Sequence, residues 1–329
     1  MSLVGIIANP ASGKDIRRLV AYGSAFDNQE KVRMVRRILL GLDAIGVDQV
    51  FYMPDYYGIV PKALDRLDIK TPVIPLEFDA KADQRDSTRA AELLEEKGAG
   101  CIVTLGGDGT NRVVAKGALT VPILPISTGT NNVFPYMVEA TIAGMAAGLV
   151  ATNRTPPEEC TFSSTRLEII LDGELVDLAI VDVAVCEDLF VGSKAVWDMG
   201  KVSQIFLNRA APGNIGLSSI GGCLHPVGAD EPGCLCLTLG DGGFCVKAPV
   251  APGVISEVFV SGKRVMNAGE EAEIATVPSV LALDGEREVE VRRGRNARIR
   301  LAEDGPRVVD VNRTMNSAMR RSILVSRPN

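Results

Sequence analysis

The first 150 residues alternate between short apolar runs and amphipathic stretches of helical length. Because helices that connect successive strands let those strands run in one direction, this alternation predicts a parallel, doubly wound α/β domain over residues 1–152. Ligands in such sheets bind beyond the carboxyl ends of the strands. The expected strands are 3–8, 49–53, 72–76, 101–105 and 121–126, and the expected helices are 28–45, 60–67, 83–97, 111–119 and 133–150.

The pattern changes near residue 153. From there to residue 305, short alternating strands are separated by turns such as Asp172-Gly173. Closely spaced turns of this kind are typical of an antiparallel, sandwich-like domain. The tail, 306–329, contains a strand-like run and a basic helical stretch, and we expect it to pack back on the first domain. The expected fold is thus an N-terminal α/β domain with a doubly wound parallel sheet, followed by an antiparallel β-rich domain.

The charge balance limits the possible partners. A net charge of −6 and an isoelectric point near 5.1 argue against nucleic acid, or an anionic membrane, as the main partner. No apolar run approaches the ~18 residues of a spanning helix, and the first ten residues lack the basic start of a signal peptide. Seven scattered cysteines and a single histidine, His225, indicate a reduced protein without a zinc site. We therefore expect a cytoplasmic protein without stable membrane association.

The turn Gly106-Gly107-Asp108-Gly109-Thr110 lies between an expected strand and an expected helix. Such a glycine-rich turn binds anions well, because backbone N–H groups and the helix dipole point at one spot. Asp108 is unusual there, since a carboxylate repels phosphate. It fits if it takes a proton from an attacking hydroxyl or holds a metal ion beside the phosphate. The turn therefore indicates phosphoryl transfer.

Two further turns follow strands of the same sheet. Residues 9–15 nearly match a Walker A loop, but Ala8 and Asp15 stand where that motif needs glycine and serine or threonine. We therefore exclude a P-loop, and residues 9–15 are either a phosphate-binding turn or an ordinary strand-to-helix turn. Residues 127–132 carry hydroxyls, amides and a glycine before an expected helix at 133. A helix N-cap needs only one such residue, so we interpret this turn as nucleotide-binding.

Two features of the second half have more than one interpretation. Residues 211–222 are small, polar and rich in glycine, which suits either a close approach of a ligand to the backbone or a flexible surface loop. Asp-Gly-Glu occurs twice, at 172–174 and 284–286. Asp-Gly is a strong hairpin signal, so at least one copy is a simple turn, and composition does not distinguish them.

Several of these segments resemble one group of kinases. Residues 106–114 resemble the GGDGT signature shared by NAD kinases, diacylglycerol kinases and sphingosine kinases. Residues 9–14 resemble the first ATP loop of the lipid kinases, and 125–132 their proline-to-GTxN segment. Residues 212–226 resemble a loop of NAD kinases, and 281–286 resemble the late DGE element. In this order they are most similar to the ATP-NAD kinase and acetoin-catabolism protein X group, over most of the chain.

The resemblance implies a two-domain kinase whose site lies between a nucleotide-binding domain and an acceptor-binding domain at 153–305. It implies Mg²⁺, ATP or polyphosphate as donor, a small-molecule acceptor such as NAD, and a homo-oligomer. The implied catalytic residues are Asp108, as base or magnesium-linked acid, and Glu286, which leaves 172–174 as a hairpin. The implied nucleotide-binding residues are Asn9, Ser12, Gly13, Gly106, Gly107, Gly109, Thr110, Thr128, Gly129, Thr130 and Asn131, and the implied acceptor-binding residues are Asn132, Asp182, Asn214 and Ser218.

One stretch departs from the NAD kinases, which carry an asparagine–acid pair that grips the ribose of NAD. The acid is retained here as Asp182, whereas Val181 replaces the amide. Valine forms no hydrogen bond with a ribose hydroxyl, and such a loss costs about 1–3 kcal/mol. The departure weakens NAD as the acceptor but leaves ATP as the donor. Two alternatives stay open: a diacylglycerol-type lipid kinase, which the acidic charge disfavours, and a non-catalytic nucleotide-binding regulator.

Overall fold

A sheet of seven strands organises the first part of the chain, in the order β3-β2-β1-β4-β5-β17-β6. The computed structural model describes residues 1–13, 21–23, 26–187 and 199–326. The strands of this sheet are β1 (Leu3–Ala8), β2 (Gln49–Tyr52), β3 (Val73–Pro75), β4 (Cys101–Gly106), β5 (Ile123–Ser127), β6 (Thr161–Ser163) and β17 (Arg307–Val309). All neighbouring pairs run parallel except β6, which is antiparallel to β17.

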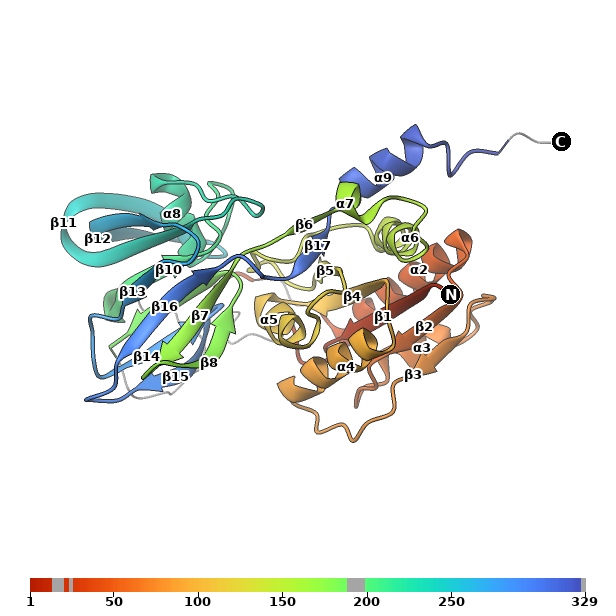
Figure 1. Cartoon of the computed structure of the whole chain (residues 1–329), viewed down its shortest axis with the longest axis horizontal. Helices are drawn as coiled ribbons and strands as arrows, with labels where there is room; N and C mark the ends of the chain where they lie inside the picture. The colour runs from red at the N-terminus through yellow and green to blue at the C-terminus, as the bar shows by residue number, and fades with distance from the viewer. Residues whose placement is uncertain (14–20, 24–25, 188–198, 327–329) are drawn as a thin grey trace.

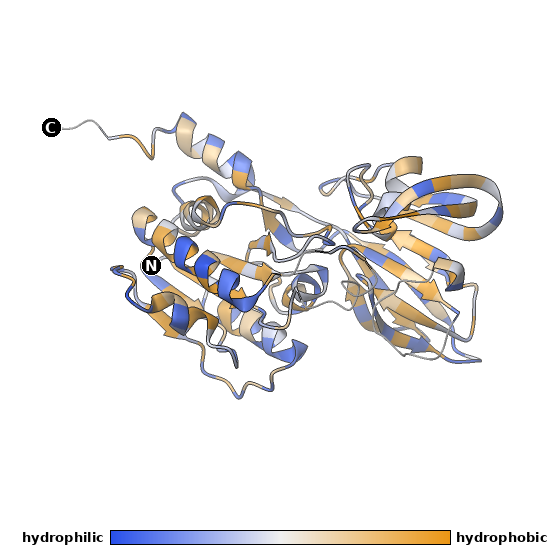
Figure 2. Ribbon diagram, turned by 180° about the vertical axis from the view of Figure 1, so that it is seen from behind, coloured by the Kyte–Doolittle hydropathy of each residue, from blue (hydrophilic) through white to orange (hydrophobic). Residues whose placement is uncertain are grey.

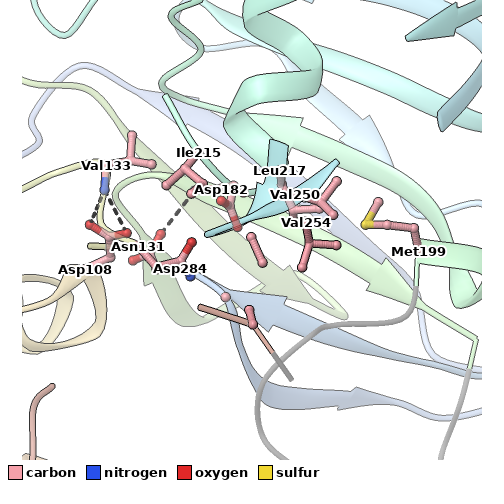
Figure 3. A pocket seen from close by; sticks show the side chains of 14 residues that line it. Asp108, Asn131, Val133, Asp182, Met199, Ile215, Leu217, Val250, Val254 and Asp284 are labelled. Atoms are coloured by element: carbon pink, nitrogen blue, oxygen red, sulfur yellow. Dashed lines mark hydrogen bonds between the residues drawn. The ribbon is translucent and has the colours of Figure 1, made fainter. Parts of the chain in front are cut away.

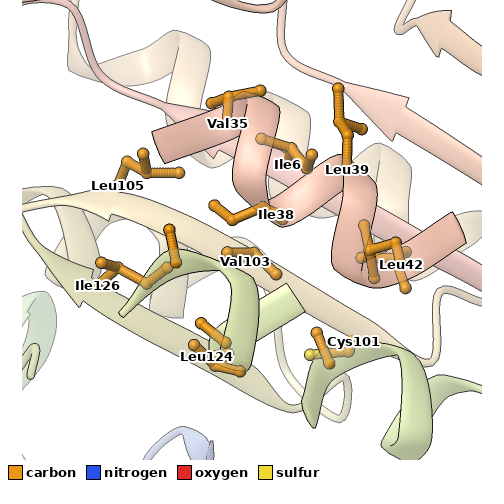
Figure 4. Packing of buried hydrophobic residues seen from close by; sticks show 14 of the residues in the cluster. Ile6, Val35, Ile38, Leu39, Leu42, Cys101, Val103, Leu105, Leu124 and Ile126 are labelled. Carbon is orange, nitrogen blue, oxygen red and sulfur yellow. The ribbon is translucent and has the colours of Figure 1, made fainter. Parts of the chain in front are cut away.

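Helices cover both faces of this sheet (Figure 1). Ile6 of β1 and Val103 of β4 pack with Ile38 of α2 on one face (Figure 4), whereas Ile7 packs with Leu94 of α4 on the other. Burial on both faces explains why these strands are apolar throughout instead of alternating. The helices of this domain are α2 (Asn28–Ile45), α3 (Ile59–Leu64), α4 (Gln84–Glu96), α5 (Asp108–Gly117), α6 (Ala140–Ala151), α7 (Pro157–Cys160) and α9 (Val311–Arg320).

The second domain contains two antiparallel sheets that enclose a core of their own. Their strand orders are β12-β11-β10-β9-β14-β15 and β13-β16-β7-β8. Hydrophobic residues are concentrated on the strands of both domains (Figure 2). The elements are β7 (Arg166–Leu171), β8 (Glu174–Ala179), β9 (Asp182–Cys186), a 3₁₀ turn (Met199–Lys201), β10 (Val202–Leu207), α8 (Leu217–Leu224), β11 (Cys234–Ala251), β12 (Val254–Met266), β13 (Glu271–Glu273), β14 (Ser279–Leu283), β15 (Glu286–Val291) and β16 (Ala297–Ala302).

The predicted fold class is confirmed. One further feature follows from the order in which the chain forms its strands. Strand β6 lies in the first sheet, although residues 153–305 were assigned to the second domain. The tail supplies β17, which lies between β5 and β6 through the pair Val308↔Ile123. The β-rich domain is therefore inserted between two strands of the first sheet. None of the helices in the described ranges combines the length and apolar character that crossing a membrane requires.

The helix expected at 133–150 begins only at Ala140. Residues 133–139 are not helical: 133–135 form a bend, and Tyr136 forms a parallel bridge with Ile126 of β5. Two physical causes act here. Pro135 disfavours a helical conformation in the residue before it, and Glu139 caps α6 by accepting from the backbone N–H of Thr141. The turn at 127–132 therefore does not open a helix, and a helix dipole does not contribute to it.

Candidate functional site

Three polar turns meet at the carboxyl edge of the first sheet, after β1, β4 and β5. The Asn9 backbone N–H donates to Leu105, and the Asn9 side-chain amide donates to the Thr110 hydroxyl at 2.9 Å. The hydroxyls of Ser12 and Thr128 share a hydrogen bond at 3.0 Å. These contacts hold the turns 9–13, 106–110 and 127–132 together, as the strand alternation indicated.

Glycine is required at two positions in these turns. A Cβ on Gly106 would lie 2.4 Å from the Cβ of Thr110, so any side chain there would displace the threonine. Gly13 has φ +73°, and a Cβ on it would lie 2.8 Å from the Thr128 carbonyl oxygen. The left-handed conformation and the close approach both exclude other residues. At these two positions the packing leaves no room for a side chain.

Helix α5 begins inside the glycine-rich turn, three residues earlier than the sequence indicated. Its N-cap is Gly107, and no side chain caps it. The first-turn amides of a helix lack partners within the helix, and the helix dipole places partial positive charge beside them. This end of α5 can therefore bind a phosphate group.

Asp108 is the first residue of α5, and its carboxylate is held by the turn after β5. Its Oδ1 accepts from the backbone N–H of Val133 at 3.0 Å and of Phe134 at 2.8 Å. This residue therefore links α5 to the segment that was expected to be helical. A role as base or metal ligand stays a prediction for Asp108.

Lys31 of α2 holds the turn 9–13 in place through hydrogen bonds. This residue was not identified from the sequence. The side chain is buried, and its Nζ donates to the carbonyl oxygens of Asn9 at 2.8 Å and Ser12 at 2.7 Å, and to Asn28 Oδ1 at 3.1 Å. A lysine four residues before Val35 on the apolar face of the helix was the available signal. Its ammonium group fixes the position of the 9–13 turn.

A cavity of about 710 Å³, here called the N-terminal cavity, opens beside these turns. Asn9 and Gly109 lie in its wall, and Glu286 reaches it from the start of β15. The Glu286 carboxylate carbon lies 3.7 Å from where a Cβ of Gly109 would be. The other lining residues are Pro10, Ala11, Met53, Pro54, Asp55, Tyr56, Ala80, Ala82, Asp83, Gln84, Arg85, Asp86, Ser87 and Val113.

A second cavity of about 340 Å³, here called the interdomain cavity, lies between the two domains. In Figure 3, Asp108, Asn131 and Asp284 lie toward one end together with Val133, and Met199, Val250 and Val254 lie toward the other. Its wall contains Ala21, Asp108, Asn131, Val133, Asp182, Met199, Ile215, Gly216, Leu217, Val250, Ala251, Val254, Asp284 and Gly285.

The two cavities share a wall made of two short segments. Asp108 lines the interdomain cavity and the next residue, Gly109, lines the N-terminal cavity. In the same way, Asp284 and Gly285 line the interdomain cavity and Glu286 lines the N-terminal cavity. The first segment belongs to the glycine-rich turn, and the second to the late Asp-Gly-Glu. The two cavities therefore approach each other at these residues.

The two Asp-Gly-Glu copies have the same turn geometry and different surroundings. Asp172 and Asp284 both have φ 51°, and each begins a hairpin turn. Asp172 is half-exposed and pairs with Arg295. Asp284 is buried, and its carboxylate accepts from the backbone N–H of Val181 at 2.8 Å, with further bonds from Ile180 and Asp182. Burial raises the pKa of Asp284 to about 6, against the lowering influence of Arg112 and these amides.

Arg112 of α5 is a second residue that the sequence reasoning did not single out. The side chain is buried at 1% exposure, and its guanidinium lies 3.2 Å from both Asp177 and Glu288, and 3.9 Å from Asp284. All three acids belong to the β-rich domain. Arg112 therefore joins the helix of the glycine-rich turn to the second domain. A basic residue beside Val113 and Val114 in an apolar helix was the available signal.

Two family models divide the chain between them. The ATP-NAD kinase N-terminal domain model matches residues 4–154, and the acetoin catabolism protein X C-terminal domain model matches residues 165–304. Acetoin catabolism protein X of Cupriavidus necator is 39% identical over 301 residues, which is 87% of this chain and 84% of that protein. The chain belongs to the acetoin catabolism protein X family. A solved structure named "A putative diacylglycerol kinase from Bacillus anthracis str. Sterne" covers 94% of this chain and 98% of its own, with 15% identity and a TM-score of 0.46.

In this member of the acetoin catabolism protein X family, the expected site residues are distributed unevenly. Asn9, Gly109 and Glu286 line the N-terminal cavity, and Asp182 lines the interdomain cavity. Asn131, expected on the nucleotide, lines the interdomain cavity instead. The remaining expected residues support the turns or lie outside both linings: Ser12, Gly13, Gly106, Gly107, Thr110, Thr128, Gly129, Thr130, Asn132, Asn214 and Ser218.

Three expected acceptor-binding residues lie outside the lining of the interdomain cavity, and each has a physical reason. The Asn132 amide donates to the Ser127 hydroxyl at 2.8 Å, which directs it into its own turn. Ser218 is fully buried in the first turn of α8. Asn214 precedes the apolar residues that line the cavity, Ile215 and Leu217. Residues 211–222 thus contribute apolar surface to the cavity through Ile215 and Leu217. Two residues of the first turn, Lys14 and Asp15, lie outside the described residues.

Proposed function

We propose that this member of the acetoin catabolism protein X family is a Mg²⁺-dependent kinase that transfers a phosphoryl group from ATP, or polyphosphate, to a hydroxyl of a small molecule. The observation that carries the proposal is the wall shared by the two cavities at Asp108–Gly109 and Asp284–Glu286. A donor phosphate on one side and an acceptor hydroxyl on the other would meet there. Positioning of this kind is the main contribution of a protein to phosphoryl transfer.

The N-terminal cavity is the proposed donor site. The uncapped start of α5 faces the three turns and suits the terminal phosphates, and Asn9 lines the cavity beside them. Among the described residues no three side chains gather as a metal site. Mg²⁺ needs no such cluster, because it takes one or two protein carboxylates and completes its shell with phosphate oxygens and water. Glu286 would hold it, and bound Mg²⁺ would offset the charge of the phosphates.

The interdomain cavity is the proposed acceptor site. Asp108 lies in its wall and is fixed by two backbone amides. In the proposed mechanism Asp108 orients the acceptor hydroxyl toward the phosphoryl group and takes its proton. The acetoin catabolism named for the relative is the proposed metabolic setting, a cytoplasmic location is part of the proposal, and a homo-oligomer stays a prediction.

Transfer of radiolabelled phosphate from ATP to a panel of alcohols, with Mg²⁺ and with a chelator, tests this function. Asp108→Asn is expected to lower turnover by a factor of about 10²–10⁴, because a positioned base contributes that much. Asp172→Asn, in an exposed hairpin, is the matched control and should keep full turnover. Near-normal turnover in Asp108→Asn, or transfer that persists in the chelator, would contradict the proposed mechanism.

A second candidate is a nucleotide-binding regulator without turnover. The hydrogen bonds of Asp108 favour it, because a carboxylate that holds Val133 and Phe134 already has a structural purpose. Calorimetric titration with ATP separates the two candidates. ATP binding with no labelled product across the acceptor panel would favour the regulator.

A further inference from the structure

Arg209 carries a buried positive charge at the junction of the two domains. The residue follows β10 and is 5% exposed. Its guanidinium donates to the Ser164 hydroxyl at 3.1 Å, and its Nε atom has no hydrogen-bond partner among the described residues. Burial lowers the pKa of Arg209 to about 10, so the group stays charged at neutral pH. Because a buried charge is costly to keep, its position is a candidate for a functional role.

The cation contacts an aromatic ring of the first domain. The guanidinium carbon lies 4.2 Å from the centre of the Phe134 ring, and Phe134 is fully buried. A cation over a ring is attracted by the ring quadrupole, and more strongly where water is excluded. Arg209 belongs to the β-rich domain, whereas Phe134 follows β5 of the first sheet. The pair therefore ties the segment 133–139 to the other domain.

Phe134 in turn holds Asp108. Its backbone N–H donates to Asp108 Oδ1 at 2.8 Å, and the Val133 N–H donates to the same atom at 3.0 Å (Figure 3). Asp108 lines the interdomain cavity at the shared wall, and it also attracts the Arg209 cation electrostatically. A displacement of Arg209 would therefore move the two amides that hold Asp108.

The backbone of Arg209 is linked to the other acid of the shared wall. The Arg209 N–H donates to the Val181 carbonyl oxygen at 3.3 Å, and the N–H of Asn208 donates to the same oxygen at 2.8 Å. The Val181 N–H donates to Asp284 Oδ1 at 2.8 Å. The place from which the arginine side chain extends is thus fixed beside Asp284.

We propose that Arg209 is a positioning residue that fixes Asp108 relative to Asp284 across the domain junction. Arg209 is outside the linings of both cavities, and it acts through Phe134 on one side and Val181 on the other. This inference rests on the proposed function, in which Asp108 orients the acceptor hydroxyl. A misplacement of about 1 Å in such a group can cost roughly 10²-fold in rate.

Exchange of backbone amides tests the inference without any substrate. Hydrogen exchange of Val133 and Phe134, measured by NMR on the full chain, reports the bonds to Asp108. Arg209→Met removes the charge and keeps a long apolar side chain, and we expect it to raise both exchange rates at least about tenfold. Arg209→Lys keeps a cation beside the ring and should lie closer to the original chain than Arg209→Met does.

Arg313→Met is the matched control, because Arg313 of α9 also lies over a phenylalanine ring, that of Phe162 at 5.9 Å. This variant should leave the exchange of Val133 and Phe134 unchanged. Unchanged exchange in folded Arg209→Met, or an equal rise in Arg313→Met, would overturn the inference. If Arg209→Met does not fold, Phe134→Leu removes the ring, keeps the arginine and takes its place with the same expected result.

Kinetics separate positioning from a purely structural role. In the phosphoryl-transfer assay, Arg209→Met should lower kcat by about 10²-fold. It should leave the KM for ATP within about twofold, because Asn9 and Lys31 hold the donor turns. A raised KM with an unchanged kcat, or a normal kcat despite faster exchange, would overturn the positioning role. Absence of transfer in the original protein contradicts only the proposed function, since amide exchange does not depend on turnover.

Discussion

The side-chain amide of Asn9 donates a hydrogen bond to the hydroxyl of Thr110 at 2.9 Å, although 101 residues separate the two in the chain. The Asn9 Oδ1 atom also accepts from the backbone N–H of Ala11 at 2.8 Å. One side chain thus shapes its own turn and ties it to the glycine-rich turn. The proposed donor site depends on this pair because the two turns follow different strands of the sheet.

Replacing Asn9 with alanine should separate the two turns. The Asn9→Ala variant loses both hydrogen bonds of the side-chain amide, one through Nδ2 and one through Oδ1, and we expect about 1–2 kcal/mol less stability and a KM for ATP raised roughly tenfold. Thermal unfolding and steady-state kinetics measure the two effects. Asn267→Ala, on the exposed surface of the β-rich domain, is the control, and an equal response of both variants would argue against a role of Asn9 at the donor site.

Lys31→Met should destabilise the protein without removing any cavity-lining group. The variant leaves the carbonyl oxygens of Asn9 and Ser12 without their buried donor, so we expect a loss of about 2–3 kcal/mol. Urea unfolding gives the value. Lys263→Met, on the exposed face of β12, should change the free energy of unfolding by less than ~0.5 kcal/mol. If Lys31→Met were as stable as Lys263→Met, the buried ammonium would not support the turn.

Asp284 predicts a pH dependence of stability. Burial raises its pKa from 3.8 to about 6, so the folded protein holds the proton more tightly than the unfolded chain does. This stabilising contribution is complete below about pH 4 and is lost as the pH rises through about 6. At 1.36 kcal/mol for each pKa unit, the loss is about 3 kcal/mol.

Asp284→Asn removes this titration and should gain stability relative to the original chain as the pH rises from about 4 to 7. Urea unfolding at several pH values measures the difference between the two proteins, which cancels the titration of other groups. Asp172→Asn has the same turn geometry with a half-exposed side chain, and its difference should stay flat. A flat difference for Asp284→Asn as well would show that burial does not shift this carboxyl.

Arg112→Leu should weaken the contact between the two domains. The change removes the buried guanidinium that lies beside Asp177, Glu288 and Asp284, and removing one partner of a buried ion pair costs about 3–5 kcal/mol. Calorimetry should show a lower unfolding temperature and separate transitions for the two domains. Arg295→Leu breaks an exposed pair with Asp172 and should cost less than about 1 kcal/mol, so a similar effect of both variants would contradict the assignment.

The parallel domain was accessible from sequence because its signals are local. The period of α2 and its N-cap, Asp27, follow from the residues themselves, and the helix runs from Asn28 to Ile45 as expected. The helix predicted over 133–139 was wrong: Pro135 and the cap residue Glu139 were present in the sequence as stop signals, and the bridge between Tyr136 and Ile126 was not visible in it. An apolar run alone does not show whether it lies beside a strand or continues into a helix.

Only part of the candidate site could be predicted from the sequence. Strand alternation predicts that the turns 9–13, 106–110 and 127–132 share one edge, and they do. Three features depend on contacts between segments that are distant in the chain. They are the cavity wall at Asp284, the buried charge of Arg112, and the hydrogen bonds from Lys31 to the turn 9–13. The two Asp-Gly-Glu copies show the limit clearly, since the same three residues form the same turn and only tertiary packing buries one of them.

Strand β17, between β5 and β6, affects the order in which the protein can assemble during synthesis. The seven-stranded sheet stays divided until residues 307–309 leave the ribosome, because β6 has no other strand to join it to β5. The inserted β-rich domain, whose strands are all earlier in the chain, has no such wait. The first sheet is therefore completed only after the whole β-rich domain has been made, because its strand β17 follows that domain in the chain.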